Sequence, residues 1–250
     1  MLLAAQSALA TSDRTSAVAH LARAEAKLQA GGAEASWLWA AHLYDGASTC
    51  SGAERALAHV KGSDVSQIRD ECKRLRRLVA MPAKGVATEH EYVGVVQRAQ
   101  QEALLGRHTD AMRDARSLQE TFPGTPGGAV IACLVDGQQK PAGEARKSCE
   151  SARGAAPEAF LPRYVLGLLH CAEGHFADAR TELESALALE DSTTSAWASL
   201  AAVYDQLGDG ASAKALAARY RTRFRSTLRP AIWPAGWPHP AAEITSPPRR

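Results

Sequence analysis

Apolar residues between 160 and 224 recur at helical spacing, in two stretches that match one another at an offset of 34 residues. Leu166 corresponds to Leu200, and Ala179 corresponds to Ala213. In each stretch, one apolar stripe is followed by a turn that contains glycine and then by a second stripe. Spacings of three and four residues place such stripes on one face of a helix. Each stretch is therefore predicted to be a repeat of two amphipathic helices joined by a short turn.

The same pattern extends toward the N-terminus, so that four repeats begin at residues 92, 126, 160 and 194. The twentieth position of each repeat is alanine: Ala111, Ala145, Ala179 and Ala213. We expect this alanine where the two helices of a repeat cross, because a larger side chain would hold them apart. The repeat at 126 contains Gly127, Gly128, Gly137 and Pro141. Because glycine and proline weaken helices, we expect this repeat to be shorter or looser than its neighbours.

The rest of the chain divides around these four repeats, which together span 92–227. Residues 34–67 are predicted to form one more repeat, and residues 1–33 a degenerate or truncated helical unit. Residues 68–91 are out of register and are predicted to be a helical insertion, where we expect a bend or a subdomain boundary. Alternating strand patterns bounded by turns are absent from the sequence. The fold class is therefore predicted to be all-α, with a tail rich in proline and tryptophan over 228–250.

One motif gives the repeat a family resemblance. Trp197, Leu200 and Tyr204 are followed by Gly208 and Ala213, and this pattern with a period of 34 resembles the tetratricopeptide repeat (TPR) family. The resemblance covers 34–67 and 92–227. It implies a right-handed α-α superhelix, a solenoid in which each repeat packs only on its neighbours.

The resemblance also implies a concave groove lined by the first helix of each repeat. The implied groove residues are Val96, Gln100, Val130, Leu134, Gln138, Tyr164, Leu168, Ala198, Asp205 and Gln206. Some family members hold a partner's C-terminal carboxylate with lysine and asparagine at the fifth and ninth positions, and neither residue stands there in this chain. The groove is mostly apolar with a polar rim, which suits an amphipathic helix or an extended apolar peptide.

Trp233 and Trp237 lie in the proline-rich tail, which cannot build a core of its own. Exposed indole rings cost free energy, so both should be covered by other surfaces. We expect them to fold back onto the superhelix, since a tethered segment has a high effective concentration. Docking on a partner is the alternative.

The net charge and the cysteine content bear on the class of partner and on the cellular compartment. The formal net charge is +2, with basic clusters over 73–77 and 219–229, which we interpret as solvated helix faces and not as a nucleic-acid site. The five cysteines are odd in number and widely spaced, so we expect small buried thiols and no disulfide framework. This favours the cytoplasm, with a periplasmic or envelope-associated location as the alternative, and no segment is long enough to span a bilayer.

No catalytic motif was found, and the chain is predicted not to be an enzyme and to need no cofactor. The closest group of possible metal ligands is His170, Cys171 and His175, which lacks a fourth partner, so no metal site is expected. The predicted function is a protein–protein interaction scaffold or adaptor with a partner of unknown identity. One alternative is a regulatory or sensory domain of a larger enzyme or transcription regulator. A metal-dependent enzyme that uses the histidine group is the minor alternative.

Overall fold

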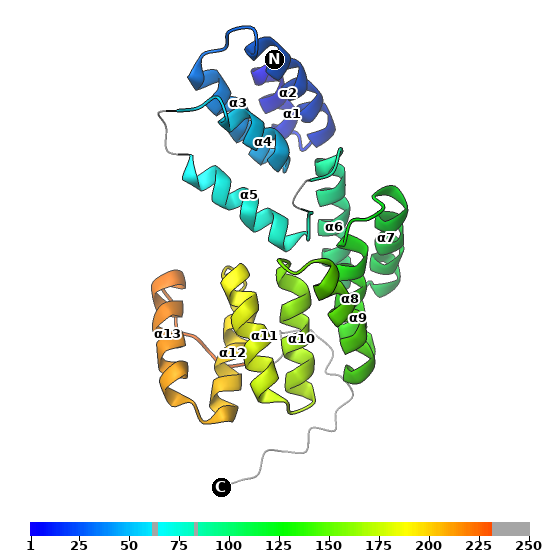
Figure 1. Ribbon diagram of the computed structural model, residues 1–250, viewed down its shortest axis with the longest axis vertical. Coiled ribbons are helices and arrows are strands. Elements are labelled where there is room, and N and C mark those ends of the chain that lie inside the picture. Colours follow the sequence, from blue (N-terminus) through cyan, green and yellow to red (C-terminus); the bar gives the residue numbers. More distant parts are fainter. Residues whose placement is uncertain (62–64, 83–84, 232–250) are drawn as a thin grey trace. The chain divides into compact units, whose positions relative to one another are not determined.

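The computed structural model describes residues 1–61, 65–82 and 85–231 (Figure 1). Within these ranges the secondary structure is α-helical and contains no strand, which confirms the predicted all-α class. The helices are α1 (Leu2–Ala10), α2 (Arg14–Leu28), α3 (Glu34–Gly46), α4 (Cys50–Leu57), α5 (Ser66–Leu78), α6 (Glu89–Leu104), α7 (His108–Thr121), α8 (Gly127–Gln139), α9 (Ala142–Ala155), α10 (Phe160–Ala172), α11 (Phe176–Leu189), α12 (Thr194–Leu207) and α13 (Gly210–Phe224).

Consecutive helices pack as antiparallel pairs, in the manner of a TPR-like solenoid. The chain divides into an N-terminal unit, Met1–Gln97, and a C-terminal unit that begins at Arg98. The first contains α1 to α5 and the start of α6, and the second contains the end of α6 and α7 to α13.

In the N-terminal unit, α1 pairs with α2 and α3 pairs with α4. The carboxylate of Asp13 accepts a hydrogen bond from the Ser16 amide at 3.0 Å and so caps α2. The ring of Trp37 on α3 stacks on His59, with the centroids 4.0 Å apart. The Trp37–His59 contact connects α3 to the segment that follows α4.

Helix α5 has no partner helix of its own in the N-terminal unit and packs on α3 and α4. Its stripe of apolar residues buries Ile68 and Cys72. After α5 the chain turns into α6, where the Tyr92 hydroxyl donates to the Val79 and Ala80 carbonyls. The buried carboxylate of Glu89 accepts from the Ser51 amide at 2.9 Å. Hydrogen bonds of α6 side chains therefore connect α6 to α4 and to the end of α5.

In the C-terminal unit, the helices of a repeat meet on small residues. Ala111, Ala145 and Ala179 are 0% exposed, as predicted for the crossing position. A methyl group added at Gly167 on α10 would lie 2.6 Å from Leu183 Cγ on α11, so only glycine fits that approach. Ala213 is half-buried, because it lies on α13, the last helix of the stack that the structure describes.

The repeat at 126 differs from the expectation in two ways. Its helix α8 has 13 residues, the same length as α10, so the predicted shortening is wrong. Cys133 on α8 and Cys149 on α9 form a disulfide, with their Cα atoms 4.6 Å apart. The expectation of unpaired thiols is wrong for these two, because the helical hairpin brings together positions that are 16 residues apart. Cys50, Cys72 and Cys171 are buried free thiols, as expected.

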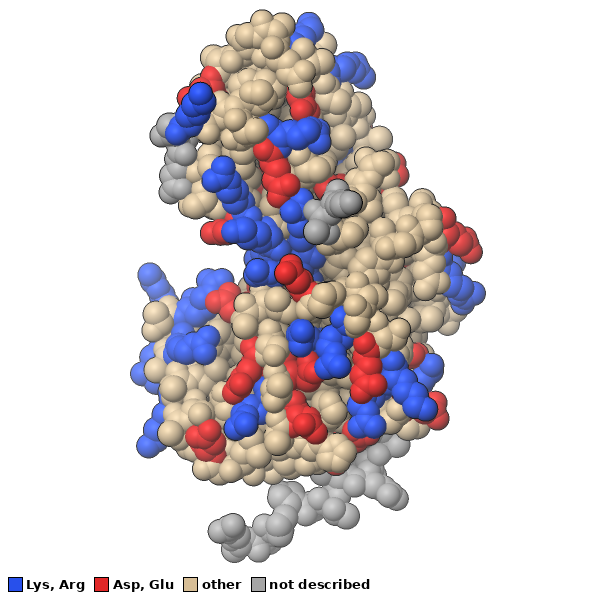
Figure 2. All heavy atoms as spheres, in the orientation of Figure 1, with Lys and Arg blue, Asp and Glu red and all other residues tan. Residues whose placement is uncertain are grey.

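Ion pairs cross from one helix to the next on the surface of the C-terminal unit. Arg146 on α9 pairs with Glu173 at 2.6 Å, and Arg153, also on α9, pairs with Glu182 on α11. Lys and Arg alternate with Asp and Glu over this part of the face shown in the lower half of Figure 2. The Glu182 carboxylate is buried, so its pairing with Arg153 offsets the cost of removing that charge from water.

The two basic clusters also have local partners. On α5, Lys73 pairs with Asp70 at 3.3 Å and Arg76 with Glu54 at 2.9 Å. On α13, Arg223 pairs with Asp191 at 3.2 Å, and the guanidinium of Arg219 lies 5.2 Å from the Trp197 ring centroid. These contacts agree with the interpretation of both clusters as helix faces. None of the described helices has the length and apolar character that crossing a membrane requires.

Candidate functional site

The groove residues implied by the family resemblance lie on the first helices of the repeats, and the structure buries about half of them. Val96, Val130 and Leu168 are 0% exposed and Leu134 is 1% exposed, so their side chains pack against other residues of the chain. Val96 belongs to the N-terminal unit, since that unit ends at Gln97. The other three form an apolar layer in the C-terminal unit.

Polar groove residues lie at the ends of these helices. Asp205 and Gln206 at the end of α12 are exposed, and Gln100 on α6 is half-buried. Gln138 on α8 is buried, and the oxygen of its side-chain amide, Oε1, lies 2.7 Å from His108 Nε2. Gln138 is therefore already engaged within the protein, whereas Asp205 and Gln206 are open to solvent.

Tyr164 on α10 is the largest groove residue and is 3% exposed. Burial raises the pKa of Tyr164 to about 12, and hydrogen bonds to Ser195 and Ser199 on α12 offset part of that increase. The hydroxyl is therefore protonated at neutral pH.

The segment that follows α13 returns to the same helix α12 (Figure 1). The Ala231 amide donates to the Ala198 carbonyl at 3.0 Å, and the Ser199 hydroxyl donates to the Ala231 carbonyl at 3.1 Å. Ala198 is half-buried at this point. Both backbone groups of Ala231 are thus held by a helix that the family resemblance assigns to the groove. Trp233 and Trp237, the expected docking residues, lie outside the described residues.

A second cluster lies at the turn between α10 and α11. Ligand-type atoms of His170, Glu173 and His175 all lie within 4.8 Å of one another. Nδ1 of His175 is 3.6 Å from Oε2 of Glu173. The sequence grouping included Cys171 and not Glu173. Cys171 is buried, which raises the pKa of its thiol to about 12 and keeps it protonated.

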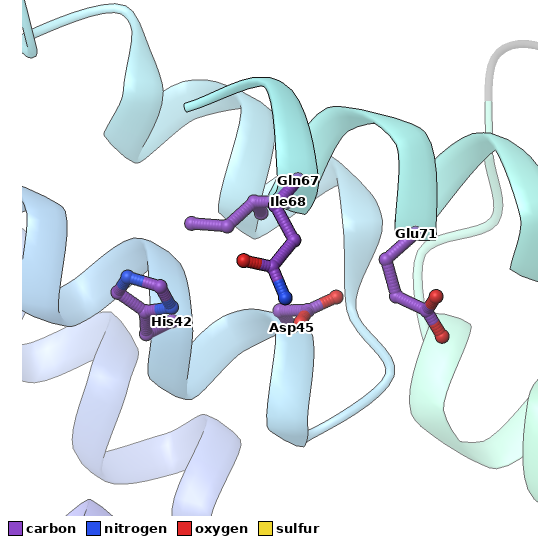
Figure 3. Close-up of a pocket in the computed structure, with 5 residues that line it drawn as sticks. All are labelled: His42, Asp45, Gln67, Ile68 and Glu71. Carbon is purple, nitrogen blue, oxygen red and sulfur yellow. The ribbon is translucent and has the colours of Figure 1, made fainter. Parts of the chain in front are cut away.

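A third feature is a cavity of about 300 Å³ in the N-terminal unit (Figure 3). Its lining is His42 and Asp45 from α3 and Gln67, Ile68 and Glu71 from α5. The His42 ring and the Gln67 amide both point toward Asp45 in the close-up. Burial, followed by the charge of Glu71, raises the pKa of Asp45. The lining is polar, and the carboxylate of Glu71 in it is paired with Arg74.

Sequence reasoning missed three of these groups for identifiable reasons. Glu173 stands between His170 and His175 in the sequence, and a carboxylate could have been counted as a ligand there. Ser199 and Ala231 have no sequence signal, because their contact joins positions 32 residues apart across α13. The cavity depends on how α5 packs on α3, which periodicity does not specify.

Comparisons with known proteins give a fold likeness only. The chain matches no protein-family model, and no curated protein matches it. One solved structure with which it aligns is the crystal structure of a thermophilic TPR protein from Thermus thermophilus. The two are 20% identical, the alignment covers 78% of this chain and 93% of the other, and the TM-score is 0.43. The TPR-like character of this chain therefore rests on its own helix pairs and its 34-residue period.

Proposed function

We propose that the chain is a non-enzymatic interaction scaffold that binds a protein segment on the face formed by α8, α10 and α12. The observation that carries this proposal is the seat of Ala231 on α12. A backbone amide and a backbone carbonyl are both held there, by the Ala198 carbonyl and the Ser199 hydroxyl. Backbone hydrogen bonds of this kind accept an extended peptide irrespective of its side chains. The face can therefore hold extended chain.

The chemistry around this seat indicates the class of partner. Half-buried Ala198 presents methyl surface above the buried Tyr164, while Asp205 and Gln206 add exposed polar groups at the end of α12. An apolar centre with a polar rim is typical of peptide-binding faces. The buried layer of Val130, Leu134 and Leu168 acts as support, because these side chains are in the core and not on the open surface. The proposed partner is an extended peptide with apolar side chains.

The protein's own tail is proposed as the first occupant of this face. Ala231 is already seated, and Trp233 and Trp237 follow directly in the sequence. Tethering raises the effective concentration of the tail to the millimolar range for a short linker. An external peptide must therefore compete with the tail. This mode of regulation requires no conformational change in the helices.

The proposal is tested with the full chain and a displayed library of random peptides. Peptides selected on the Trp233→Ala/Trp237→Ala double variant should bind that variant at least tenfold more tightly than the unaltered chain. Ala198→Asp should abolish their binding, because it places a larger, charged side chain on the half-buried surface where the peptide backbone is held. Lys147→Ala, at an exposed position of α9, is the control and should leave binding unchanged. Equal binding to Ala198→Asp and to the control would contradict the proposed face.

We also propose an oxidising compartment, such as the periplasm, in place of the cytoplasm that the cysteine pattern favoured. The support is the Cys133–Cys149 disulfide, because disulfides persist in oxidising compartments and are rare where thiols are kept reduced. Thiol labelling of the protein in intact cells tests this location. Free thiols are first blocked, then the disulfides are reduced and the new thiols are labelled. We expect Cys133 and Cys149 to escape the block and to be labelled only after reduction.

A further inference from the structure

The side chains of His170, Glu173 and His175 come together because the helical hairpin reverses direction between them. His170 lies in the last turn of α10, Glu173 is the residue that caps α10, and His175 is the residue before α11. Gly174 between them has a φ of +77°, a conformation that side-chain-bearing residues rarely adopt. The tight turn directs both histidines and the carboxylate to one place, with their ligand-type atoms within 4.8 Å.

His170 does not make the hydrogen bond that the residue at the equivalent position of the next repeat makes. Tyr204 occupies the equivalent position in the next repeat, and its hydroxyl donates to Glu184 of the preceding helix at 2.7 Å. Glu150 stands twenty residues before His170, as Glu184 stands before Tyr204. It lies 3.7 Å from Arg146.

The imidazole therefore does not take over the tyrosine's role. Nδ1 of His170 is buried and has no hydrogen-bond partner among the residues that the structure describes. A buried ring nitrogen without a partner costs free energy, which a ligand at this point would recover.

We propose that His170, Glu173 and His175 bind a divalent transition-metal cation of the zinc type. Two imidazoles and one carboxylate are a ligand set that Zn²⁺ accepts, with the fourth position left for water or a partner's side chain. Bond lengths of about 2.0–2.1 Å to a tetrahedral ion place ligand atoms about 3.4 Å apart. The Nδ1–Oε2 distance of 3.6 Å between His175 and Glu173 is already close to that value.

The movement of the side chains that metal binding requires is small. The widest ligand-atom separation of 4.8 Å has to close by about 1.4 Å to reach the tetrahedral value. The His175 side chain is 54% exposed and so is free to rotate toward the other two. Arg146 Nη1 lies 2.6 Å from Glu173 Oε2 and fixes the orientation of the carboxylate. A hydrogen-bonded partner of this kind is typical of carboxylates that bind metals.

Metal binding at this point would tie the end of α10 to the start of α11. Because the three ligands come together only in the folded hairpin, the ion stabilises the folded repeat by mass action. The site is separate from the proposed peptide face, since no residue of that face is a ligand. Its presence or absence therefore does not decide the scaffold function.

The test is a calorimetric titration of the full chain with Zn²⁺ after treatment with a chelator, with Co²⁺ as a spectroscopic probe. We expect one ion per chain, and visible Co²⁺ absorption typical of coordination by nitrogen and oxygen. His170→Tyr is the key variant, because it restores the residue type of the next repeat and so preserves packing. His170→Tyr, Glu173→Gln and His175→Ala should each weaken Zn²⁺ binding at least tenfold, and His20→Ala on α2 should not.

Thermal unfolding gives an independent readout. Saturating Zn²⁺ should raise the Tm of the unaltered chain and of His20→Ala, but not that of His170→Tyr. The proposal is overturned if Zn²⁺ does not bind saturably. It is equally overturned if binding depends on His175 alone and survives both His170→Tyr and Glu173→Gln.

Discussion

In the C-terminal unit the two helices of a repeat meet on alanine, whereas in the N-terminal unit α3 and α5 meet across a polar cavity. Ala111, Ala145 and Ala179 are fully buried where paired helices cross. The cavity between α3 and α5 has a volume of about 300 Å³ and carries Asp45 and Glu71 in its lining. The difference follows the repeat register: helices in register close on small side chains, and α5, which is out of register, does not.

Both units also bury polar groups. The N-terminal unit buries Glu89 against the Ser51 amide and holds Cys50 beside Cys72, which, with burial, raises the pKa of the Cys50 thiol. The C-terminal unit also buries charged groups, among them Asp114 and Glu182, and it adds glycine and alanine contacts and one covalent bond between α8 and α9. Three predictions test this comparison.

The largest effect is expected from removal of the disulfide in the C-terminal unit. A bond that closes a loop of about 16 residues stabilises the folded state by about 3 kcal/mol, chiefly by restricting the unfolded chain. The Cys133→Ser/Cys149→Ser double variant should lose about that much stability in urea unfolding, and a reducing agent should do the same to the unaltered chain. The control is Cys171→Ser, which removes a buried free thiol on α10. The reductant should lower the stability of this variant by no more than it lowers that of the unaltered chain. Unfolding curves that reductant leaves unchanged in every protein would contradict this prediction.

A smaller loss is expected from enlargement of a crossing alanine. Ala179 is 0% exposed between α10 and α11, so Ala179→Leu forces the helices apart and should cost about 2–3 kcal/mol. Ala213→Leu is the matched control, because the same repeat position is half-buried on α13. Its cost should be less than about 1 kcal/mol. Urea midpoints of the two variants give the comparison, and equal losses would show that the crossing position is not what limits packing.

The smallest effect is expected at the cavity of the N-terminal unit. Burial and the charge of Glu71 raise the pKa of Asp45 above its ordinary value of 3.8, so the ionised group destabilises the folded state. That penalty is fully present above the folded pKa and disappears as the pH falls below the unfolded value. Asp45→Asn should therefore raise stability by roughly 0.5 kcal/mol at pH 7 and by nothing in strong acid.

Asp70→Asn on the exposed side of α5 is the control for that measurement, and its stability should not rise at pH 7. Thermal unfolding of both variants across the pH range tests the sign of the effect. A gain in the acid range that vanishes at neutral pH would show that Asp45 is stabilised as an ion, and that the cavity is not a region of excess negative charge.

The sequence by itself determined the helices and the positions where they touch within a repeat. Apolar spacing and the 34-residue period predicted the all-α class, and the alanine of each repeat predicted the crossing point at Ala111, Ala145 and Ala179. These features are local, since each depends on residues within one helical hairpin. Helix periodicity and a small side chain are therefore sufficient to specify them.

Only the tertiary structure decided what lies between hairpins or depends on exact side-chain geometry. It joined Cys133 to Cys149, brought Glu173 beside two histidines, and seated Ala231 on α12. It also placed Val130, Leu134 and Leu168 in the core, where a position rule had assigned them to an open groove. A sequence pattern gives the face of a helix on which a residue lies. It does not give the distance between two faces, and disulfide, metal and peptide contacts all depend on that distance.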